Sequence, residues 1–326
     1  MSHFAIIGGG AWGTALGCLY ARAGHAPRIL ARDAETVAAI NESRRNPRYL
    51  PDTPLPAGLI ATTEPAEALA GARTILFVVP AQSLRTVAAD LAPHIADDAL
   101  AILCSKGIER ETGRFATDVL AEVLPGRPLA VLSGPSFAAD VARGLPTAVT
   151  IAAETEEAAD AAARRLSTET FRGYATADMR GVEAGGALKN VLALAAGAVA
   201  GRGLGASAQA AIVTRGFVEL RRLGAALGGR PDTLMGLSGL GDLVLTCSSA
   251  QSRNFAYGMA LGRGDDRAGL KLAEGVFTAE IAARLAQEHR IDAPIIATVA
   301  AILAGQLDID AAIEALLARP LKRETV

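Results

Sequence analysis

The sequence predicts two unlike halves, an α/β half built around a doubly wound parallel sheet and an all-helical half that follows it. Three observations lead to this prediction. Short apolar runs alternate with alanine-rich segments, a glycine-rich turn follows the first of these runs, and strand-like patterns stop near Met179. We therefore expect domains at 1–180 and 181–326, with a hinge near residues 177–184.

Six apolar runs bounded by turn-forming residues are typical of buried strands. Segments of helical composition, such as Gly13–Ala23 and Leu84–Leu91, separate most of them. This alternation predicts a parallel sheet with helices on both faces, because parallel neighbours need a crossover connection. The predicted strands are Phe4–Ile7, Arg28–Ala31, Thr74–Val79, Leu100–Cys104, Leu129–Leu132 and Ala148–Ala152.

The turn after the first strand has the spacing of a dinucleotide-binding loop, with glycines at Gly8, Gly10 and Gly13. The first glycine permits the tight turn, the second lets the backbone approach a pyrophosphate, and the third lets the helix pack closely on the strand. Glycine-rich turns are common, but this one follows a strand and opens a helix, which makes it informative. The first half therefore predicts a Rossmann-type nucleotide-binding domain.

The second predicted strand leads into Arg32 and Asp33, where such domains recognise the ribose of the cofactor. An acidic residue at this place usually binds the ribose 2′-hydroxyl of NAD, whereas a guanidinium suits the 2′-phosphate of NADP. Because Arg32 comes first and three more arginines follow before residue 50, we favour NADPH. Asp33 keeps NADH open.

Polar residues follow two later strands at the edge where ligands bind in such sheets. Lys106 lies in a turn after one strand, and the run from Ser133 to Ser136 follows another. We expect Lys106 to lie over the cofactor, the alternative being a solvated loop lysine.

The second half begins its helical pattern with the most apolar segment of the chain, and Lys189 and Asn190 stand near its start. An unpaired ammonium there would be costly, and burial lowers a lysine pKa towards neutrality, which suits a general acid. The alternative is a lysine that extends from a helix end to solvent. The predicted helices are Gly185–Ala200, Ala206–Leu227, Ala250–Arg263, Thr278–His289 and Ala311–Ala318.

Two later segments offer partners for Lys189 and for an anionic substrate. Asp242 ends a glycine-rich run with apolar flanks and is the partner we expect for Lys189, or else a helix-capping residue. Ser252, Arg253 and Asn254 place a hydroxyl, a guanidinium and an amide at the start of a helix. This set can hold a phosphate, or Ser252 can be a plain N-cap.

Composition narrows the class of protein and draws attention to the lysines. Hydrophobic residues make up 51% of the chain and the net charge is −2, which does not suggest nucleic-acid binding. Only four of the 32 basic residues are lysine. Since arginine supplies most generic positive charge here, Lys106 and Lys189 are candidates for a titratable ammonium.

The N-terminus lacks a signal-peptide layout, and the longest apolar run, Val191 to Ala200, is too short for a membrane span of ~20 residues. Three cysteines stand far apart in the sequence and form neither a metal-binding pair nor a disulfide framework. We expect buried thiols, no metal, no integral membrane segment and a cytoplasmic protein.

Together these motifs resemble the bacterial type of NAD(P)-dependent glycerol-3-phosphate dehydrogenase. The resemblance spans nearly the whole chain in order. Its segments are Gly8–Leu16, Asn46–Pro51, Ser105–Gly113, Leu132–Ala138, Gly181–Val191, Ala210–Gly216, Met235–Cys247, Ser252–Asn254 and Ala273–Val276.

The resemblance implies reversible reduction of dihydroxyacetone phosphate to sn-glycerol 3-phosphate for phospholipid synthesis, with NADPH or NADH as cofactor. It makes Lys189 the proton donor, with Lys106 and Asp242 beside it, and a homodimer is compatible with it. The implied substrate residues are Lys106, Gly134, Ser136, Lys189, Asn190, Asp242, Ser252, Arg253 and Asn254. The implied cofactor residues are Gly8, Gly10, Ala11, Trp12, Gly13, Arg32, Tyr49, Lys106, Ala138, Arg253, Leu272 and Glu274.

Two alternatives stay open at the level of sequence. A related β-hydroxyacid or keto-acid reductase shares the architecture and a helix lysine, but needs a carboxylate clamp in place of a phosphate site. A nicotinamide-binding sensor without turnover needs the glycine loop but not the combination of Lys106, Lys189 and Asp242.

Overall fold

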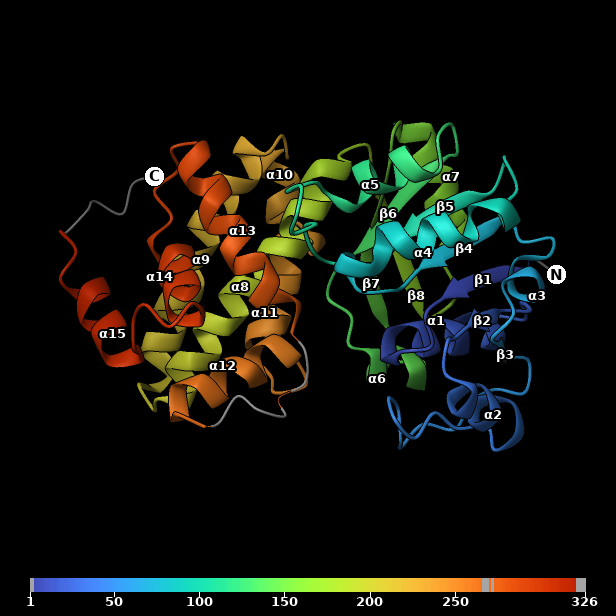
Figure 1. Ribbon diagram of the computed structural model, residues 1–326, viewed down its shortest axis with the longest axis horizontal. Coiled ribbons are helices and arrows are strands. Elements are labelled where there is room, and N and C mark those ends of the chain that lie inside the picture. The colour runs from blue at the N-terminus through green and yellow to red at the C-terminus, as the bar shows by residue number, and fades with distance from the viewer. Residues whose placement is uncertain (1–2, 266–269, 271–272, 321–326) are drawn as a thin grey trace.

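The computed structural model describes residues 3–265, 270 and 273–320. Figure 1 shows the sheet with its covering helices on one side and a separate group of helices on the other, which confirms the predicted fold class. The last strand ends at Thr176 and a long helix begins at Met179. The division into domains at 1–180 and 181–326 stays a prediction.

Within the described residues, eight strands form one sheet in the order β3-β2-β1-β4-β5-β6-β7-β8. Neighbouring strands are parallel except β6 and β7, which run antiparallel, so the prediction of an all-parallel sheet was wrong at this pair. The strands are β1 (Phe4–Ile7), β2 (Arg28–Leu30), β3 (Ile60–Thr62), β4 (Thr74–Phe77), β5 (Leu100–Leu103), β6 (Leu129–Ser133), β7 (Thr147–Ala153) and β8 (Phe171–Thr176).

Helices cover both faces of this sheet over two apolar layers. Leu16 and Tyr20 belong to one buried cluster, and the Tyr20 ring stacks on Phe4 with the ring centres 4.2 Å apart. Phe77 and Leu120 belong to the cluster on the other face. The helices are α1 (Ala11–Arg22), α2 (Ala34–Glu42), α3 (Pro65–Leu69), α4 (Leu84–Leu91), α5 (Ala116–Val123), α6 (Ala138–Arg143) and α7 (Glu156–Leu166), with 3₁₀ turns at Ala81–Ser83 and Ala92–His94.

The second half packs around α8, whose residues from Gly181 to Gly197 are all buried. Among the described residues α8 alone is long and apolar enough to cross a membrane, but 78% of its apolar window lies inside the protein, as in a core helix. The helices are α8 (Met179–Gly201), α9 (Gly205–Ala226), α10 (Pro231–Met235), a π-helical turn (Leu237–Gly241), α11 (Asp242–Cys247), α12 (Arg253–Arg263), α13 (Glu274–Glu288), α14 (Pro294–Leu303) and α15 (Ile309–Leu317).

Helices α8 and α12 cross at backbone contact because glycines face each other at the crossing. A Cβ added to Gly197 would lie 2.2 Å from the carbonyl oxygen of Phe255, and one added to Gly258 would lie 2.2 Å from that of Leu194. This close approach fixes the start of α12 beside the middle of α8.

The first two turns of α8 are attached to the sheet half. Arg180 forms an ion pair with Asp118, and the buried Glu183 accepts hydrogen bonds from the backbone N–H (2.8 Å) and hydroxyl (2.6 Å) of Thr117. Burial raises the pKa of Glu183 to about 7, with these hydrogen bonds acting against it. Helix α8 therefore begins against the sheet half and extends into the helical half, where Lys189 lies. The hinge at 177–184 stays a prediction.

Candidate active site

Two lysines from different halves of the chain meet at one buried aspartate. Lys189 Nζ lies 2.6 Å from Oδ1 of Asp242, and Lys106 Nζ lies 2.6 Å from its Oδ2. Asp242 is 1% exposed, so this carboxylate is compensated by the two ammonium groups rather than by water. The predicted pairing of Lys189 with Asp242 is confirmed, and Lys189 does not extend to solvent.

Local structure places each of these three groups. Lys189 lies in the middle of α8, Lys106 lies in the loop after β5, and Asp242 is the first residue of α11. The N-cap position of α11 is Gly241, so Asp242 is not the capping residue of the alternative prediction. Gly185 of α8 allows the π-helical turn before Asp242 to approach, because a Cβ there would lie 2.8 Å from the Ser238 carbonyl oxygen.

Thr246 completes the surroundings of the Lys189 ammonium and was missed by sequence reasoning. Its hydroxyl accepts a hydrogen bond from Lys189 Nζ and donates one of 3.3 Å to Asp242. The useful signal was its position four residues after Asp242, on the same face of a helix.

Charge and burial set the protonation of this network. Burial lowers the pKa of Lys189 from 10.5 to about 8; the ammonium of Lys106 lowers it further, and the carboxylate of Asp242 opposes both. The pKa of Asp242 is below its ordinary value because the two ammonium groups outweigh the effect of its burial. Lys189 is therefore mainly an ammonium at neutral pH but can release its proton within an accessible pH range.

The loop after β6 joins the network through a backbone carbonyl. Gly134 O accepts hydrogen bonds of 3.1 Å from both Lys106 Nζ and the Ser136 hydroxyl. Gly134 has a φ of +145°, and a Cβ there would lie 2.9 Å from Val149 Cα, so this position suits glycine. Three predicted substrate residues thus lie together at the carboxyl edge of the sheet.

A chain of amides ties α8 to α12 and α13. Asn190 Nδ2 donates to Lys106 O (3.3 Å), Asn254 Nδ2 donates to Asn190 Oδ1 (2.9 Å), and Gly275 N donates to Asn254 Oδ1 (2.9 Å). Ser252 is the N-cap of α12, and its hydroxyl accepts a hydrogen bond from Phe255 N at 3.2 Å. This agrees with the alternative prediction that Ser252 is an N-cap. Its O–H can still donate to a ligand.

Arg253 and Glu274 come together from the starts of α12 and α13. Burial raises the pKa of Glu274, while the guanidinium of Arg253 and a hydrogen bond from Ala81 N–H act in the other direction. A Cβ added to Gly107 would lie 2.8 Å from Ala81 Cβ and 3.3 Å from Glu274 Oε2, so Glu274 lies beside the loops that follow β4 and β5. Leu272, which was also predicted to contact the cofactor, lies outside the described residues.

The glycine loop has the geometry predicted for a dinucleotide site. Gly8 has a φ of +123°, and a Cβ on Gly13 would lie 1.9 Å from Gly8 O. A Cβ on Gly10 would have no atom within 4 Å in the part of the chain that the structure describes. Helix α1 begins at Ala11, with Trp12 next to it, so the positive helix end faces this open space. These residues can accept a pyrophosphate.

The ribose end of the predicted cofactor site contains Arg32, Asp33 and Tyr49. Asp33 is the N-cap of α2, with its carboxylate accepting from Thr36 N, and it lies 3.8 Å from the guanidinium of Arg48. Arg32 and Tyr49 are exposed, and Arg48 stacks over the Tyr49 ring. Ala138, another predicted cofactor residue, is the first residue of α6 after the Gly134 loop.

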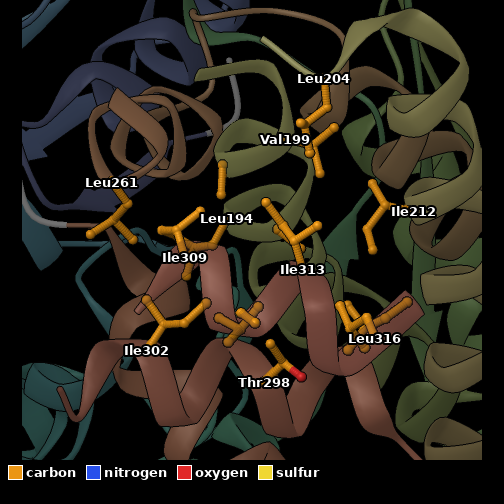
Figure 2. Close-up of a pocket in the computed structure, with 15 residues that line it drawn as sticks. Leu194, Val199, Leu204, Ile212, Leu261, Thr298, Ile302, Ile309, Ile313 and Leu316 are labelled. Atoms are coloured by element: carbon orange, nitrogen blue, oxygen red, sulfur yellow. The ribbon is translucent and has the colours of Figure 1, made fainter. Parts of the chain in front are cut away.

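A separate apolar pocket lies in the helical half, and none of the predicted site residues that the structure describes line it. Figure 2 shows it lined by side chains such as Leu194, Ile212, Leu261 and Ile313, with Thr298 the one labelled polar side chain. Its chemistry does not suit a phosphorylated substrate, so the lysine network is the better candidate site.

Known proteins resemble this chain over nearly its whole length. Family models for the N-terminus and the C-terminus of NAD-dependent glycerol-3-phosphate dehydrogenase match residues 3–159 and 178–314. The glycerol-3-phosphate dehydrogenase (NAD(P)+) of Brucella canis is 59% identical over 99% of both chains. That of Mesorhizobium japonicum is 61% identical over 98% of this chain and 93% of its own. The crystal structure of glycerol-3-phosphate dehydrogenase from Coxiella burnetii has a TM-score of 0.92 and 39% identity, covering 98% of this chain and 99% of that one.

Proposed function

The chain belongs to the NAD-dependent glycerol-3-phosphate dehydrogenase family, and we propose that its lysine network is the site where dihydroxyacetone phosphate is reduced to sn-glycerol 3-phosphate. The protein is an oxidoreductase that uses NADPH or NADH. One observation supports the assignment of the site above the others. The two ammonium groups and their shared carboxylate lie where the ligand-binding edge of the sheet meets α8.

The residues present fit a nicotinamide dinucleotide. The space in front of Gly10, the left-handed φ of Gly8 and the start of α1 form a cradle for the pyrophosphate. The residues proposed to hold the pyrophosphate are Gly8, Gly10, Ala11, Trp12 and Gly13. The proposed cofactor contacts nearer the substrate are Lys106, Ala138, Arg253 and Glu274. When bound, the cofactor supplies or accepts the hydride.

Lys189 is the proposed proton donor for the reduction. As the carbonyl carbon gains a hydride its oxygen gains negative charge, and the Lys189 ammonium gives that oxygen a proton while keeping the N–H electron pair as a neutral amine. Asp242 and Thr246 hold Nζ in place, and the charge of Lys106 stabilises the oxygen as its charge grows. In the oxidation of glycerol 3-phosphate the neutral amine of Lys189 takes the proton back.

The start of α12 is the proposed phosphate site. Ser252 and Arg253 offer a hydroxyl and a guanidinium, and the positive end of an eleven-residue helix adds to them. Asn254 is already bonded to Asn190 and Gly275, so its proposed part is to hold this start beside Lys189. Gly134 and Ser136 bound the same space from the sheet side.

NADPH is the proposed preferred cofactor. The Asp33 carboxylate is engaged as the cap of α2 and lies near Arg48, which leaves it less able to accept from a ribose hydroxyl. Arg32 is exposed beside it and can meet a 2′-phosphate. Steady-state rates with NADPH and NADH on dihydroxyacetone phosphate test this preference.

The experiment that tests the proposed function compares ketones in an NADPH-oxidation assay. We expect rapid turnover with dihydroxyacetone phosphate and little with carboxylated ketones of similar size. A preference for the carboxylated ketones would favour the keto-acid reductase, and no oxidation with any ketone would favour a sensor.

The location and the oligomeric state of the protein are also open to proposal. We propose a cytoplasmic location, supported by three cysteines that are all free and buried, as expected in a reducing compartment. A homodimer stays a prediction, which light scattering of the purified protein tests.

A further inference from the structure

Asn46, which lies between α2 and β3, contacts the Gly8–Gly13 loop and the first turn of α1 through its side chain. Its side chain is fully buried, and Nδ2 donates to Gly9 O (3.0 Å) and to the Thr14 hydroxyl (2.8 Å). These contacts join residues 32 and 37 positions apart in the sequence. Neither acceptor belongs to the local structure around Asn46, so the side chain ties two separate segments together.

The bond to Gly9 bears on how the loop meets a ligand. A peptide unit is planar and trans, so the N–H of Gly10 points opposite to the C=O of Gly9. Because Asn46 holds that C=O on its own side, the Gly10 N–H is turned away from Asn46. A Cβ on Gly10 would meet no atom of the described residues within 4 Å, and these residues leave room for a ligand there. Glycine has no Cβ and allows many backbone conformations. A hydrogen bond from a side chain can therefore fix the orientation of the Gly9–Gly10 peptide plane.

The same residue also orders the segment that lies at the ribose end. Asn46 O accepts hydrogen bonds from Tyr49 N (3.2 Å) and Leu50 N (2.8 Å), which folds residues 46–50 into a tight turn. Arg48 in this turn lies 3.8 Å from Asp33. The backbone of Asn46 thus shapes the turn near Arg32, while its side chain holds the glycine loop.

We propose that Asn46 is a positioning residue for the dinucleotide, which acts by orienting the Gly9–Gly10 peptide so that the Gly10 N–H faces the pyrophosphate. The inference rests on the proposed role of the Gly8–Gly13 loop. Asn46 touches neither the substrate residues nor Lys189, so it affects cofactor affinity and not proton transfer.

The test is steady-state kinetics of Asn46→Ala with both cofactors. The KM for NADPH and the KM for NADH should each rise about tenfold or more, which is about 1.4 kcal/mol. Both should rise by a similar factor because the pyrophosphate is common to them, and kcat at saturating cofactor should stay within about twofold. Asn46→Asp should have the larger effect, since a carboxylate would face the Gly9 carbonyl oxygen.

Asn41→Ala is the matched control. Asn41 lies five residues earlier and makes two hydrogen bonds to the backbone of Ala61 (2.8 and 2.9 Å), but neither involves the glycine loop. It should lower the melting temperature without changing the KM for either cofactor. Equal rises in KM for Asn46→Ala and Asn41→Ala, or an unchanged KM for Asn46→Ala, would overturn the proposal.

Two further variants keep the result interpretable. If Asn46→Ala does not fold, Thr14→Val removes one acceptor of Asn46 while keeping a branched side chain, and should raise the cofactor KM severalfold. An unchanged KM in that variant counts against the proposal. Gly10→Val fills the space in front of the loop, and if it leaves the cofactor KM unchanged, the proposed function of the loop has failed. A raised KM in Gly10→Val with a normal one in Asn46→Ala rejects the Asn46 proposal alone.

Discussion

The chemistry of the site depends on how one ammonium is buried. Lys189 is 6% exposed, and its pKa is lowered to about 8 chiefly because burial disfavours the charged form. The carboxylate of Asp242 keeps Nζ charged enough at neutral pH to donate a proton, and Asp242 and Thr246 together hold Nζ in one position. A lysine with an ordinary pKa would give up its proton less readily.

Replacing Lys189 by Met tests the proton donor. The variant keeps a long apolar side chain and removes the ammonium, while Asp242 retains Lys106 and Thr246 as partners. Turnover should fall by at least about a hundredfold, the lower end for a lost general acid, with the Kd for NADPH within about twofold. Stopped-flow turnover and fluorescence titration measure the two quantities, and a variant with normal turnover would exclude Lys189.

The pKa of Lys189 predicts a pH dependence with opposite signs in the two directions. Ketone reduction needs the ammonium, so its kcat should fall as pH rises through about 8. Alcohol oxidation needs the neutral amine, so its kcat should rise over the same range. Rates measured in both directions between about pH 6 and pH 10 check this, and flat profiles in both would contradict it.

Arg253→Ala tests the phosphate site. Loss of the guanidinium should raise the KM for dihydroxyacetone phosphate at least tenfold, about 1.4 kcal/mol, with a smaller effect on kcat. Arg263→Ala is the control, since Arg263 lies at the other end of α12 and pairs with Asp265 at 2.8 Å. If the two variants have the same KM, Arg253 does not bind the phosphate.

The sequence indicated much of this site at the level of single residues, for identifiable reasons. Lysines are rare in a chain rich in arginine, so Lys106 and Lys189 stood out, and Asp242 was noticed as an acid that ends a glycine-rich run with apolar flanks. Thr246 and Asn46 could not be found in this way. Asn46 acts through contacts with residues 37 and 32 positions away, and Thr246 is marked only by its place four residues after Asp242, which shows once Asp242 is known to hold Lys189.

At the scale of elements, the crossing of α8 and α12 determines where the start of α12, the proposed phosphate site, lies relative to Lys189. Glycines on both helices bring the backbones into contact, and the bond between Asn254 and Asn190 follows directly from that approach. The separation of the two helices is therefore part of the site.

Gly258→Ala tests this dependence. Because a Cβ would lie 2.2 Å from the Leu194 carbonyl oxygen, the helices must move apart. We expect a loss of about 2–4 kcal/mol of stability and a raised KM for dihydroxyacetone phosphate. Gly58→Ala makes the same chemical change where the nearest atoms lie 3.9 Å away and should be close to neutral. Chemical denaturation and steady-state kinetics give both numbers, and equal stability of the two variants would show that the crossing tolerates separation.

Elements were predictable where burial produced a clear pattern. Strands β1 and β4–β7 are apolar and were found, with β4 shorter than predicted. Strand β3 has three residues, and β8 contains Arg172 and Gly173, so neither shows an apolar run. Helix α14 is apolar nearly all round, so it lacks the polar face opposite an apolar stripe that marks a surface helix in a sequence. The antiparallel pairing of β7 depends on its connection through α6, which strand composition does not encode.

At the scale of the whole molecule, the site belongs to neither half alone. Lys106 and Gly134 come from the sheet, Lys189 and Asp242 come from the helices, and the ion pair between Lys106 and Asp242 joins them. Helix α8 is attached to α5 at its start and to α12 along its length, so it connects the sheet half to the proposed phosphate site.

We propose that this arrangement brings the amine of Lys189 to the reacting oxygen, and a structure with the oxidised cofactor and glycerol 3-phosphate bound tests this placement most directly. We predict that Lys189 Nζ lies within about 3.2 Å of the secondary hydroxyl oxygen, the reach of a hydrogen bond, with the phosphate at the start of α12. A complex in which that oxygen lies far from Nζ, with another side chain in its place, would contradict the account.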